Sequence, residues 1–569
     1  MSPRHSSPVE SQAAKGGFRF PGVHSAIWPL AALAIAAGLQ FTLVLRRAIN
    51  WDEFWYYSLI EKFAAGSLSN PLQTVHVHLF GWLVALPGNG VDHIVTGRLF
   101  MAGAEFVTLT SIAAIAAHFT DRKTGLLCAL AYLSSIFVFQ HGFSFRVDPL
   151  AAALAMASLA ILLKARLGPL AIAAFALLLG LAGMVTIKAI LLAPAFAGIA
   201  WLRLAEARRP IPTAARIAAC VIAAATTFGL LYWLHSAALD QNLGVREVQS
   251  GGTFVKGAAN YAIALGLPAY PQYVLKNVTH SPLQAALLIA APFAILRSGL
   301  SRDRKIALAG LLATGLVFFL YRNTLPYFYA FILPPIVCAA APAMRLAVQR
   351  SSALIAAGAL LASTFILWLA EPASPIDKQR RIIDAAEEIF PSPVAYFDFC
   401  AMLGTFEKVS PFMTTWGMDR YRQAGVPVLR RRMERVTVPL VLASEQQAYL
   451  TFEQLLTTSE PSSYFLEEDA EALRGNYIHF WGPFWLAGKT IAPGEAEQHD
   501  EFLVPGPYTV HDAAIRVNGT VHEPGDIITL QRGDHMLQVP GDESARLMWG
   551  EALREPRQPP PERPFWTDF

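Results

Sequence analysis

Apolar residues form long, nearly uninterrupted stretches over the first two thirds of the chain, and they become short and interrupted after about residue 370. A helix that spans a bilayer needs about 20 predominantly apolar residues. Eleven stretches approach that length, and we predict an α-helical multi-spanning membrane protein with about 11 transmembrane helices. The predicted helices cover residues 26–45, 95–118, 124–140, 149–164, 168–186, 188–203, 213–234, 281–296, 305–321, 326–344 and 352–370.

Two connections between the predicted spans are long, at residues 46–94 and 235–280. The first contains WDEFWYYSLIEKFAAG (51–66) and HVHLFGWLVALPG (76–88), which are apolar and aromatic but too short to span a membrane. Because Trp and Tyr are favoured at the membrane–water boundary, we expect amphipathic helices that lie at the interface. The second connection is rich in Gly and Tyr and fits either a mobile lid or an ordinary connector.

Charge divides the chain at the same point as hydrophobicity. Residues 1–370 hold 12 acids and 27 bases, a net charge of +15, whereas residues 371–569 hold 30 acids and 18 bases, a net charge of −12. Cytoplasmic loops of membrane proteins carry an excess of Lys and Arg. The segment 1–25 and every second loop after it are basic, so we predict a cytoplasmic N-terminus and a C-terminal region on the outer side. This topology explains the positive charge without nucleic acid, and so long an apolar part excludes a soluble enzyme.

The polar C-terminal region predicts an extracytoplasmic domain in two parts. Residues 371–475 mix helix-like and strand-like patterns and predict an α/β unit. Residues 476–550 contain short alternating strands separated by Asn-Gly and Pro-Gly turns, which predicts a β-rich module. Residues 551–569 are rich in proline and are expected to be irregular. The four cysteines are too scattered for a disulfide framework or a zinc cluster.

Because the membrane part has so few acids, those at its predicted outer surface are conspicuous. Asp52 and Glu53 directly follow the first span, and Asp148 directly precedes the fourth. A carboxylate at a membrane boundary is costly unless it is paired or used. The sequence therefore favours a functional role for these acids, with structural ion pairs as the alternative.

Four bases face the same side, namely Arg98, Arg146, Lys188 and Arg322. The positive-inside rule gives no reason to keep them there. They either contact lipid headgroups with their long side chains or bind an anionic group, and Arg and Lys suit phosphate by charge and geometry. Glu105 lies two helical turns after Arg98. This spacing allows the two side chains to share a face and to be linked through neighbouring groups, which favours an orienting ion-pair network.

His76 and His78 lie two residues apart in the first outer loop. In an extended segment the two imidazoles share a face, and with the nearby acids they can hold a metal ion. On a helix they do not share a face, and two histidines alone are a weak signal for a metal site.

Several motifs now occur in an informative order. They are WDE (51–53), HVHLFGWLVAL (76–86), GRLF (97–100), FRVDPL (145–150), TIKAILLAPAF (186–196) and YFYAFILPP (327–335). In this order and spacing the sequence resembles the GT-C glycosyltransferases, nearest the bacterial branch of the protein O-mannosyltransferase and aminoarabinose-transferase superfamily. The second motif departs from the family, which more often has a Pro-Leu pair in its middle. The resemblance covers about residues 26–350 and implies a GT-C-like transmembrane catalytic domain over residues 26–370.

The resemblance implies a function and a location. A sugar is transferred from a polyprenyl phosphate carrier to an acceptor hydroxyl or phosphate of a cell-envelope glycan, lipid A or a protein, on the periplasmic side of a bacterial inner membrane. An inverting reaction with a carboxylate base is expected. Members that use monophosphate carriers are generally metal-independent, so no cofactor is expected, although a divalent metal stays an open alternative.

The same resemblance assigns roles to the candidate residues. Asp52 is expected to be the general base, while Glu53 and Asp148 orient the donor or the acceptor. The carrier phosphate is expected to contact Arg98, Lys188 and Arg322, and Arg146 is expected either to contact the same phosphate or to pair with Asp148. The donor site is expected to be lined by His76, His78, Tyr56, Tyr57 and Tyr327. These tyrosines are also what an aromatic belt at a membrane boundary contains.

Other functions predict other features. A transporter or flippase of lipid-linked sugars predicts ionisable residues near the bilayer midplane and repeated halves, but only Glu105 lies deep and no internal repeat is evident. A non-catalytic assembly subunit with the same fold is a further alternative, against which the intact Asp52 and Asp148 argue. Acyl or phosphoryl transfer lacks a matching nucleophile motif.

Overall fold

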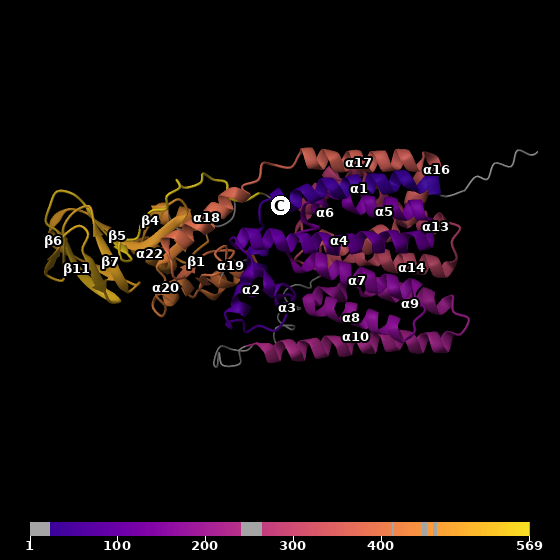
Figure 1. Ribbon diagram of the computed structural model, residues 1–569, viewed down its shortest axis with the longest axis horizontal. Coiled ribbons are helices and arrows are strands. Elements are labelled where there is room, and N and C mark those ends of the chain that lie inside the picture. The colour runs from indigo at the N-terminus through magenta and orange to yellow at the C-terminus, as the bar shows by residue number, and fades with distance from the viewer. Residues whose placement is uncertain are drawn as a thin grey trace, which may run out of the picture.

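The computed structural model describes residues 23–239, 265–411, 415–445, 452–458, 462 and 464–567. A bundle of helices forms one part of the molecule, and a mixed domain of helices and strands continues it along the long axis (Figure 1). Most of the predicted segment 1–25 and residues 240–264 of the possible lid lie outside the described residues.

All eleven predicted apolar stretches are helical. The bundle consists of α1 (Val23–Arg46), α4 (Gly90–Phe119), α5 (Arg122–Leu133), α6 (Ile136–His141), α7 (Val147–Lys164), α8 (Pro169–Val185), η2 (Ile187–Leu192), α9 (Ala193–Ala205), α10 (Pro210–Ala238), α12 (Pro271–His280), α13 (Pro282–Arg297), α14 (Arg302–Ala313), η3 (Thr314–Phe319), α15 (Phe328–Ala339), α16 (Ala341–Arg350) and α17 (Ala353–Leu369).

Not every predicted span is one continuous helix. Among the described residues five helices are long and apolar enough to cross a membrane, and the number rises to seven if two bent pairs each count as one span. These pairs are α12 with α13, bent by 106°, and α15 with α16, bent by 60°. The second bend precedes Pro342, which stands in the first turn of α16, and proline there ends the hydrogen bonding of a preceding helix. The eleven segments are therefore confirmed as helices, whereas several are broken.

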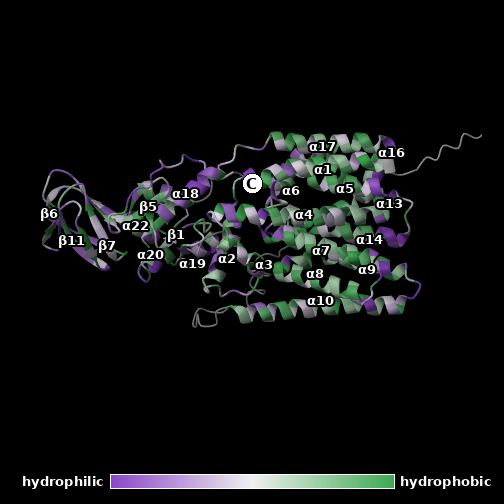
Figure 2. Cartoon of the chain, in the orientation of Figure 1, coloured by the Kyte–Doolittle hydropathy of each residue, from purple (hydrophilic) through white to green (hydrophobic). Residues whose placement is uncertain are grey.

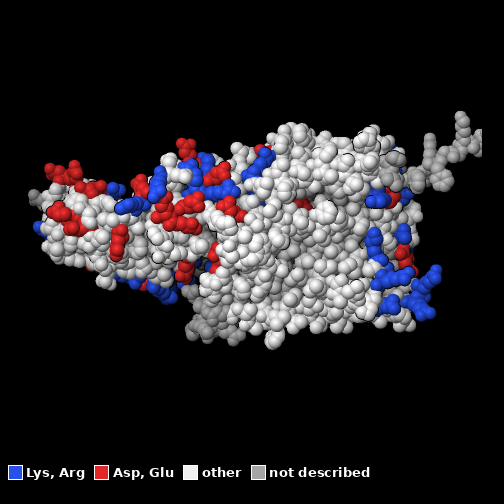
Figure 3. All heavy atoms as spheres, viewed as in Figure 1, with Lys and Arg blue, Asp and Glu red and all other residues white. Residues whose placement is uncertain are grey.

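The surface of the bundle is that of a membrane protein. Large apolar side chains are exposed around it, such as Ile211 at 82%, Trp233 at 64% and Leu296 at 71%. The middle of the bundle is apolar and almost free of charge on the face shown, and Lys and Arg gather at the end far from the C-terminal domain (Figures 2 and 3). An exposed apolar band of this extent is compatible with lipid and not with water. The predicted fold class is confirmed.

The first outer loop folds as predicted into short helices beside the C-terminal domain. They are α2 (Trp51–Ala64), α3 (His76–Phe80) and η1 (Gly81–Ala85). A capping box starts α2: the Asn50 side chain accepts a hydrogen bond from the backbone, and the Asn50 N–H donates to Glu53 at 2.9 Å. Such a cap satisfies helix donors that otherwise lack partners.

The C-terminal domain is built around one long sheet. Its elements are α18 (Ile376–Ile389), β1 (Ala395–Phe397), β2 (Glu407–Lys408), α19 (Thr415–Ala424), α20 (Val428–Met433), β3 (Leu440–Leu442), α21 (Phe452–Thr457), α22 (Glu467–Asn476), β4 (Tyr477–Trp481), β5 (Phe484–Ile491), β6 (Gly494–Phe502), β7 (Gly506–His511), β8 (Ile515–Val517), β9 (Thr520–His522), β10 (Ile527–Leu530), β11 (Gly533–Val539) and β12 (Ala545–Trp549). The strand order is β10-β7-β12-β5-β3-β1-β2, with β4 also paired to β5. A second sheet has the order β6-β11-β8-β9.

Strand β5 joins the two predicted parts of this domain. It pairs antiparallel with β3, where Val441 lies opposite Trp485, and also with β12. Strands β1 and β3 are parallel, with Tyr396 opposite Leu440. Residues 371–475 and 476–550 therefore share a sheet.

The C-terminal domain packs directly on the first outer loop. A single buried cluster contains Phe54 and Ile60 of the loop together with Ile383 and Tyr396 of the domain. Buried Trp566, near the end of the irregular segment 551–569, belongs to the same cluster. The start of α2 is therefore held between the bundle and the C-terminal domain.

Candidate active site

A buried ion pair fixes the start of α2 against the bundle. Arg98 of α4 donates from Nε and Nη2 to the two carboxylate oxygens of Glu53, at 2.7 and 2.6 Å. Its remaining N–H groups bind the carbonyls of Val44, Arg47 and Ala48 at the end of α1. A guanidinium has five N–H donors, so every donor of Arg98 is used. Both side chains are 1% exposed.

Glu53 also fixes the position of the chain segment that precedes α7. The Phe145 N–H donates to Glu53 Oε1 at 2.6 Å. Burial alone would raise the pKa of Glu53, but the charge and hydrogen bonds of Arg98 hold it below its usual value, so the carboxylate stays charged. Both side chains are buried and bound to each other and to the backbone, so neither is open to the donor, acceptor or phosphate contacts expected from the sequence.

Four charged side chains then alternate in a short row. Arg146, just before α7, pairs with Asp52 through Nη1 and lies 3.6 Å from Asp148 Oδ2 through Nη2. Lys188 pairs with Asp148 through Oδ1. The order is Asp52, Arg146, Asp148, Lys188. The starts of α2 and α7 and the 3-10 helix η2 therefore meet in this row.

The row is buried in its middle and reachable at its ends. The side chains of Asp148 and Arg146 are 0% and 3% exposed, whereas those of Lys188 and Asp52 are 12% and 20% exposed. The two ends alone can therefore meet a ligand without rearrangement. We call Asp52, Arg146, Asp148 and Lys188 the charged row.

Aromatic rings cover Arg146. Its guanidinium lies 3.3 Å from the centroid of Tyr327 and 5.8 Å from that of Tyr56, and Lys188 Nζ lies 5.8 Å from Tyr327. Cations are attracted to the faces of such rings. Burial works to lower the pKa of Arg146, but the Asp52 and Asp148 carboxylates outweigh it and raise that pKa. Arg146 is therefore a permanent positive charge.

A break between two helices places Lys188. Helix α8 ends at Val185, and the Thr186 side chain caps η2 by accepting from the Lys188 N–H at 3.4 Å. Arg322 follows η3 and is exposed. Its neighbour Tyr321 interacts electrostatically with Lys188 and Asp148. Arg322 therefore lies in a segment that approaches the charged row.

The two histidines of the loop have different surroundings. The buried His76 ring packs edge-on to Tyr56 with centroids 5.3 Å apart, and burial lowers the pKa of His76 to about 4. His76 is thus neutral beside the row. Exposed His78 instead meets His235 of α10 at 2.8 Å, and His235 meets Thr74 at 2.7 Å.

Tyr56 and Tyr57 also have different surroundings. Tyr56 lies on the charged row, but the Tyr57 hydroxyl contacts Glu61 and His93 Nδ1, the latter at 2.5 Å. Tyr57 therefore points toward the interface with the C-terminal domain and not into the site. In the part of the chain that the structure describes, no three His, Cys, Asp or Glu side chains come close enough together to hold a metal ion.

Glu105 does not pair with Arg98. Its Oε1 accepts a hydrogen bond from Gln40 of α1 at 3.0 Å, and Arg98 is saturated by Glu53 and α1. The helical spacing shows only neighbours on the same helix. The residue that pairs with Arg98 is Glu53, 45 residues away in the chain. In the sequence, only its place as the fourth residue of an N-x-x-E capping pattern indicates a structural role.

The site can now be compared with known proteins. No protein-family model and no curated protein matches the chain. Its structure is similar to ArnT from Cupriavidus metallidurans bound to undecaprenyl phosphate, with a TM-score of 0.50 and 14% identity over 73% of this chain and 92% of that chain. For the apo state of ArnT the TM-score is 0.52 at 13% identity, with the same coverage. The archaeal oligosaccharyltransferase AglB from Archaeoglobus fulgidus, in complex with an inhibitory peptide and a dolichol-phosphate, is similar at 11% identity and a TM-score of 0.49 over 94% of this chain and 98% of that chain. The likeness to ArnT confirms the predicted GT-C fold.

Proposed function

We propose that this protein is an integral-membrane glycosyltransferase that moves a sugar from a polyprenyl phosphate to an acceptor hydroxyl or phosphate of a cell-envelope glycan, lipid A or protein. The transfer takes place on the membrane face that carries the C-terminal domain, which is the periplasmic face of a bacterial inner membrane. The observation that carries the proposal is the charged row, which brings carboxylates and cations together where the bundle meets that domain.

The cations of the row suit the carrier phosphate. Lys188 is partly exposed at one end, and exposed Arg322 makes no ion pair with any described residue. When the sugar leaves, the bridging oxygen of the carrier phosphate gains negative charge. Fixed positive groups in a site that excludes water stabilise such charge strongly. We assign Lys188 and Arg322 to the phosphate, and Arg146 to holding the two carboxylates in place.

Asp52 is the proposed base. It is the most exposed acid of the row, and it lies at the other end from Lys188. An acceptor hydroxyl has a high pKa, so a carboxylate that accepts its proton during attack lowers the barrier. The acceptor oxygen bonds to the anomeric carbon, and the bond from that carbon to the phosphate oxygen breaks. The bonding pair stays on the carrier phosphate, the proton goes to Asp52, and the configuration at the anomeric carbon inverts.

Asp148 orients rather than reacts in this scheme. Its side chain is fully buried and holds both Lys188 and Arg146. Tyr56 and Tyr327 form the wall beside the row and are proposed to face the sugar. The likeness to ArnT bound to undecaprenyl phosphate supports a polyprenyl carrier, because the same fold holds one there.

The proposal is tested with purified protein, a panel of polyprenyl-phosphate sugars and membrane extracts, with the product identified by mass spectrometry. Sugar transfer from at least one donor is expected, with and without EDTA, because Lys188 and Arg322 supply the positive charge. Failure of every donor, together with flux of lipid-linked sugar across reconstituted vesicles, would show a transporter instead. If neither sugar transfer nor flux of lipid-linked sugar is observed, the result would favour a non-catalytic assembly subunit.

A further inference from the structure

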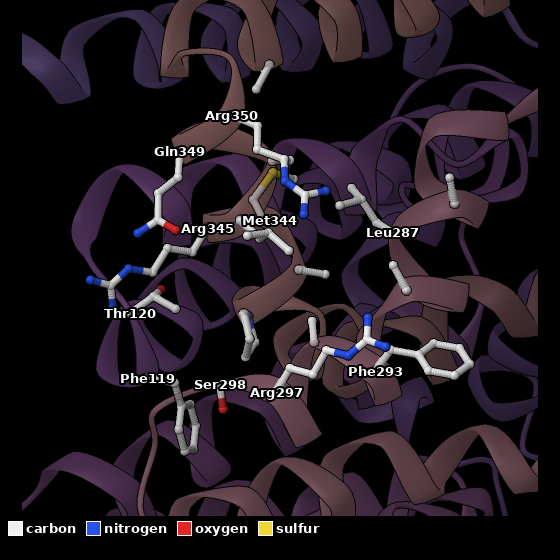
Figure 4. A pocket seen from close by; sticks show the side chains of 18 of the residues that line it. Phe119, Thr120, Leu287, Phe293, Arg297, Ser298, Met344, Arg345, Gln349 and Arg350 are labelled. Carbon is white, nitrogen blue, oxygen red and sulfur yellow. The ribbon is translucent and has the colours of Figure 1, made fainter.

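A cavity of about 1130 Å³ lies between helices of the bundle (Figure 4), and no residue of the charged row lines it. Two of its lining helices, α13 and α16, reach the end of the bundle remote from the C-terminal domain (Figure 1). Its lining comes from the end of α4, from the whole length of α13 and α16, and from the first half of α17. The proposed transferase reaction makes no use of it.

The walls of the cavity are apolar. On α13 the lining residues recur at helical spacing, as Leu283, Leu287, Ala290 and Ala294, so one whole face of this helix borders the space. Phe293, on the same side, is 59% exposed. Helix α17 contributes Leu360 and two alanines. These walls lie at the depth of the apolar band of the bundle, where the surrounding medium is lipid.

Three arginines line this apolar space. Arg297 ends α13, while Arg345 and Arg350 lie on α16. Arg297 and Arg350 extend from facing sides of the cavity, and Arg345 lies near Thr120 (Figure 4). Helix α16 is bent by 60° from α15, and both of its arginines line the cavity.

The charges of these arginines are not neutralised by the protein. No acidic residue lines the cavity. Across the described ranges of the chain, none of the three arginines is found in an ion pair or hydrogen bond. At the same end of the bundle Arg304 does pair with Glu206, at 2.9 Å. The positive-inside rule accounts for arginines at this end, but not for their concentration around one apolar cavity.

We propose that this cavity binds one anionic phospholipid of the membrane leaflet remote from the C-terminal domain. The acyl chains lie between α13 and α17, and the phosphate contacts Arg297 and Arg350. Basic pockets between transmembrane helices suit anionic headgroups, and guanidinium groups bind phosphate oxygens in pairs. A soluble anion leaves the apolar walls uncovered. A zwitterionic lipid offers a phosphate, but its ammonium group cancels that charge, so the net positive charge of the arginines stays uncompensated. The site is independent of the proposed transferase reaction.

Native mass spectrometry of the full-length protein in mild detergent tests the proposal. The protein is titrated with phosphatidylglycerol and, separately, with phosphatidylcholine. We expect one retained phosphatidylglycerol and at least about tenfold weaker retention in the double variant R297Q/R350Q, because each basic residue near an anionic headgroup contributes to binding. The matched control is R208Q/R209Q, which removes two exposed arginines at the same end of the bundle that do not line the cavity.

A third variant, L287W/L360W, fills the walls without a change in charge and is expected to lose the lipid as well. Equal losses of phosphatidylglycerol retention in R297Q/R350Q and in R208Q/R209Q would overturn the proposal. They would show that retention depends on the total positive charge at this end of the bundle and not on the cavity. Equal retention of phosphatidylcholine would overturn it too, as would displacement of the lipid by millimolar inorganic phosphate, which would show a site for a free anion. Thermal unfolding curves of all variants confirm that each one is folded.

Discussion

Glu53 and Arg98, 45 residues apart in the chain, form an ion pair in which two guanidinium nitrogens donate to the two carboxylate oxygens. Each of the two side chains is 1% exposed. The pair joins the end of α1, the start of α2 and the chain before Arg146. It holds the segments that carry Asp52 and Arg146, and its two side chains are too buried to meet a substrate. Both residues are therefore positioning residues for the proposed base.

Replacing one member of this pair leaves a buried charge. We expect Arg98→Met to destabilise the fold by about 3–5 kcal/mol, the usual cost of breaking a buried pair. The double variant E53Q/R98M removes both charges and should recover part of that loss. Thermal unfolding of the three proteins measures this coupling. In the folded fraction of each variant kcat should fall while the KM for the donor changes little. The positioning role would be contradicted if the loss of stability in the double variant equalled the sum of the losses in the two single variants. A changed KM with an unchanged kcat would contradict it as well.

Lys188 is expected to serve the donor phosphate. Lys188→Met removes the cation but keeps the length of the side chain, so donor affinity should fall about ten- to a hundredfold, as for loss of a hydrogen bond to a charged group. Isothermal titration with a donor analogue measures the affinity. The control is Lys378→Met, a change at a partly exposed lysine of α18 that donates to the Glu562 carbonyl. Unchanged donor affinity in Lys188→Met would remove Lys188 from the phosphate site.

Trp566 connects the end of the chain to the proposed base. Its ring packs edge-on against Trp51 and Phe54, with centroids 5.9 and 5.8 Å apart, and its indole N–H donates to the Ser444 carbonyl at 2.5 Å. Trp566→Ala should cost about 3–5 kcal/mol, as for other buried tryptophans, and should lower kcat because Trp51 directly precedes Asp52. Trp233→Ala, at an exposed site on α10, is the control for thermal unfolding. Equal midpoints for the two variants would show that Trp566 does not brace the site.

Glu445 makes the C-terminal domain sensitive to pH. Burial raises the pKa of Glu445 to about 8 from an ordinary value near 4.5, despite hydrogen bonds and Arg563, which act to lower it, and Asp398 adds to the rise. The folded state thus holds a proton that the unfolded state has released between these values. Stability from this group is complete below about pH 4.5 and is lost as pH rises through 8. The thermal midpoint should therefore fall by a few degrees between pH 5.5 and 8.5. Glu445→Gln should reduce that fall, and an unchanged slope would contradict the assignment.

Much of this arrangement could be predicted from the sequence. The outer ends of predicted spans carry four of the site residues, Asp52, Asp148, Arg146 and Lys188. Helix ends on one side of a membrane lie near one plane, so these residues are expected close to one another. Their convergence therefore followed from topology.

Other features have no local signal. The pairing of Arg98 with Glu53 has no signal in the helical spacing that suggested a network with Glu105, because that spacing reports contacts within one helix only. The contact of Trp566 with Trp51 joins opposite ends of the chain, and no periodicity encodes such a contact. Tyr56 and Tyr57 are adjacent and equally aromatic, and only the direction of α2 decides which of them faces the charged row.

The central claim is that Asp52 takes the acceptor proton, and Asp52→Asn tests it most directly because it keeps size and removes the base. The measurement is single-turnover sugar transfer from a bound polyprenyl-phosphate donor, with donor affinity measured in parallel. Asp377→Asn, at an acid that is 85% exposed on α18, is the control. We predict that Asp52→Asn folds and binds donor, while its transfer rate falls by about 10²- to 10⁴-fold, the usual contribution of a general base. A transfer rate equal to that of the wild type would contradict the account.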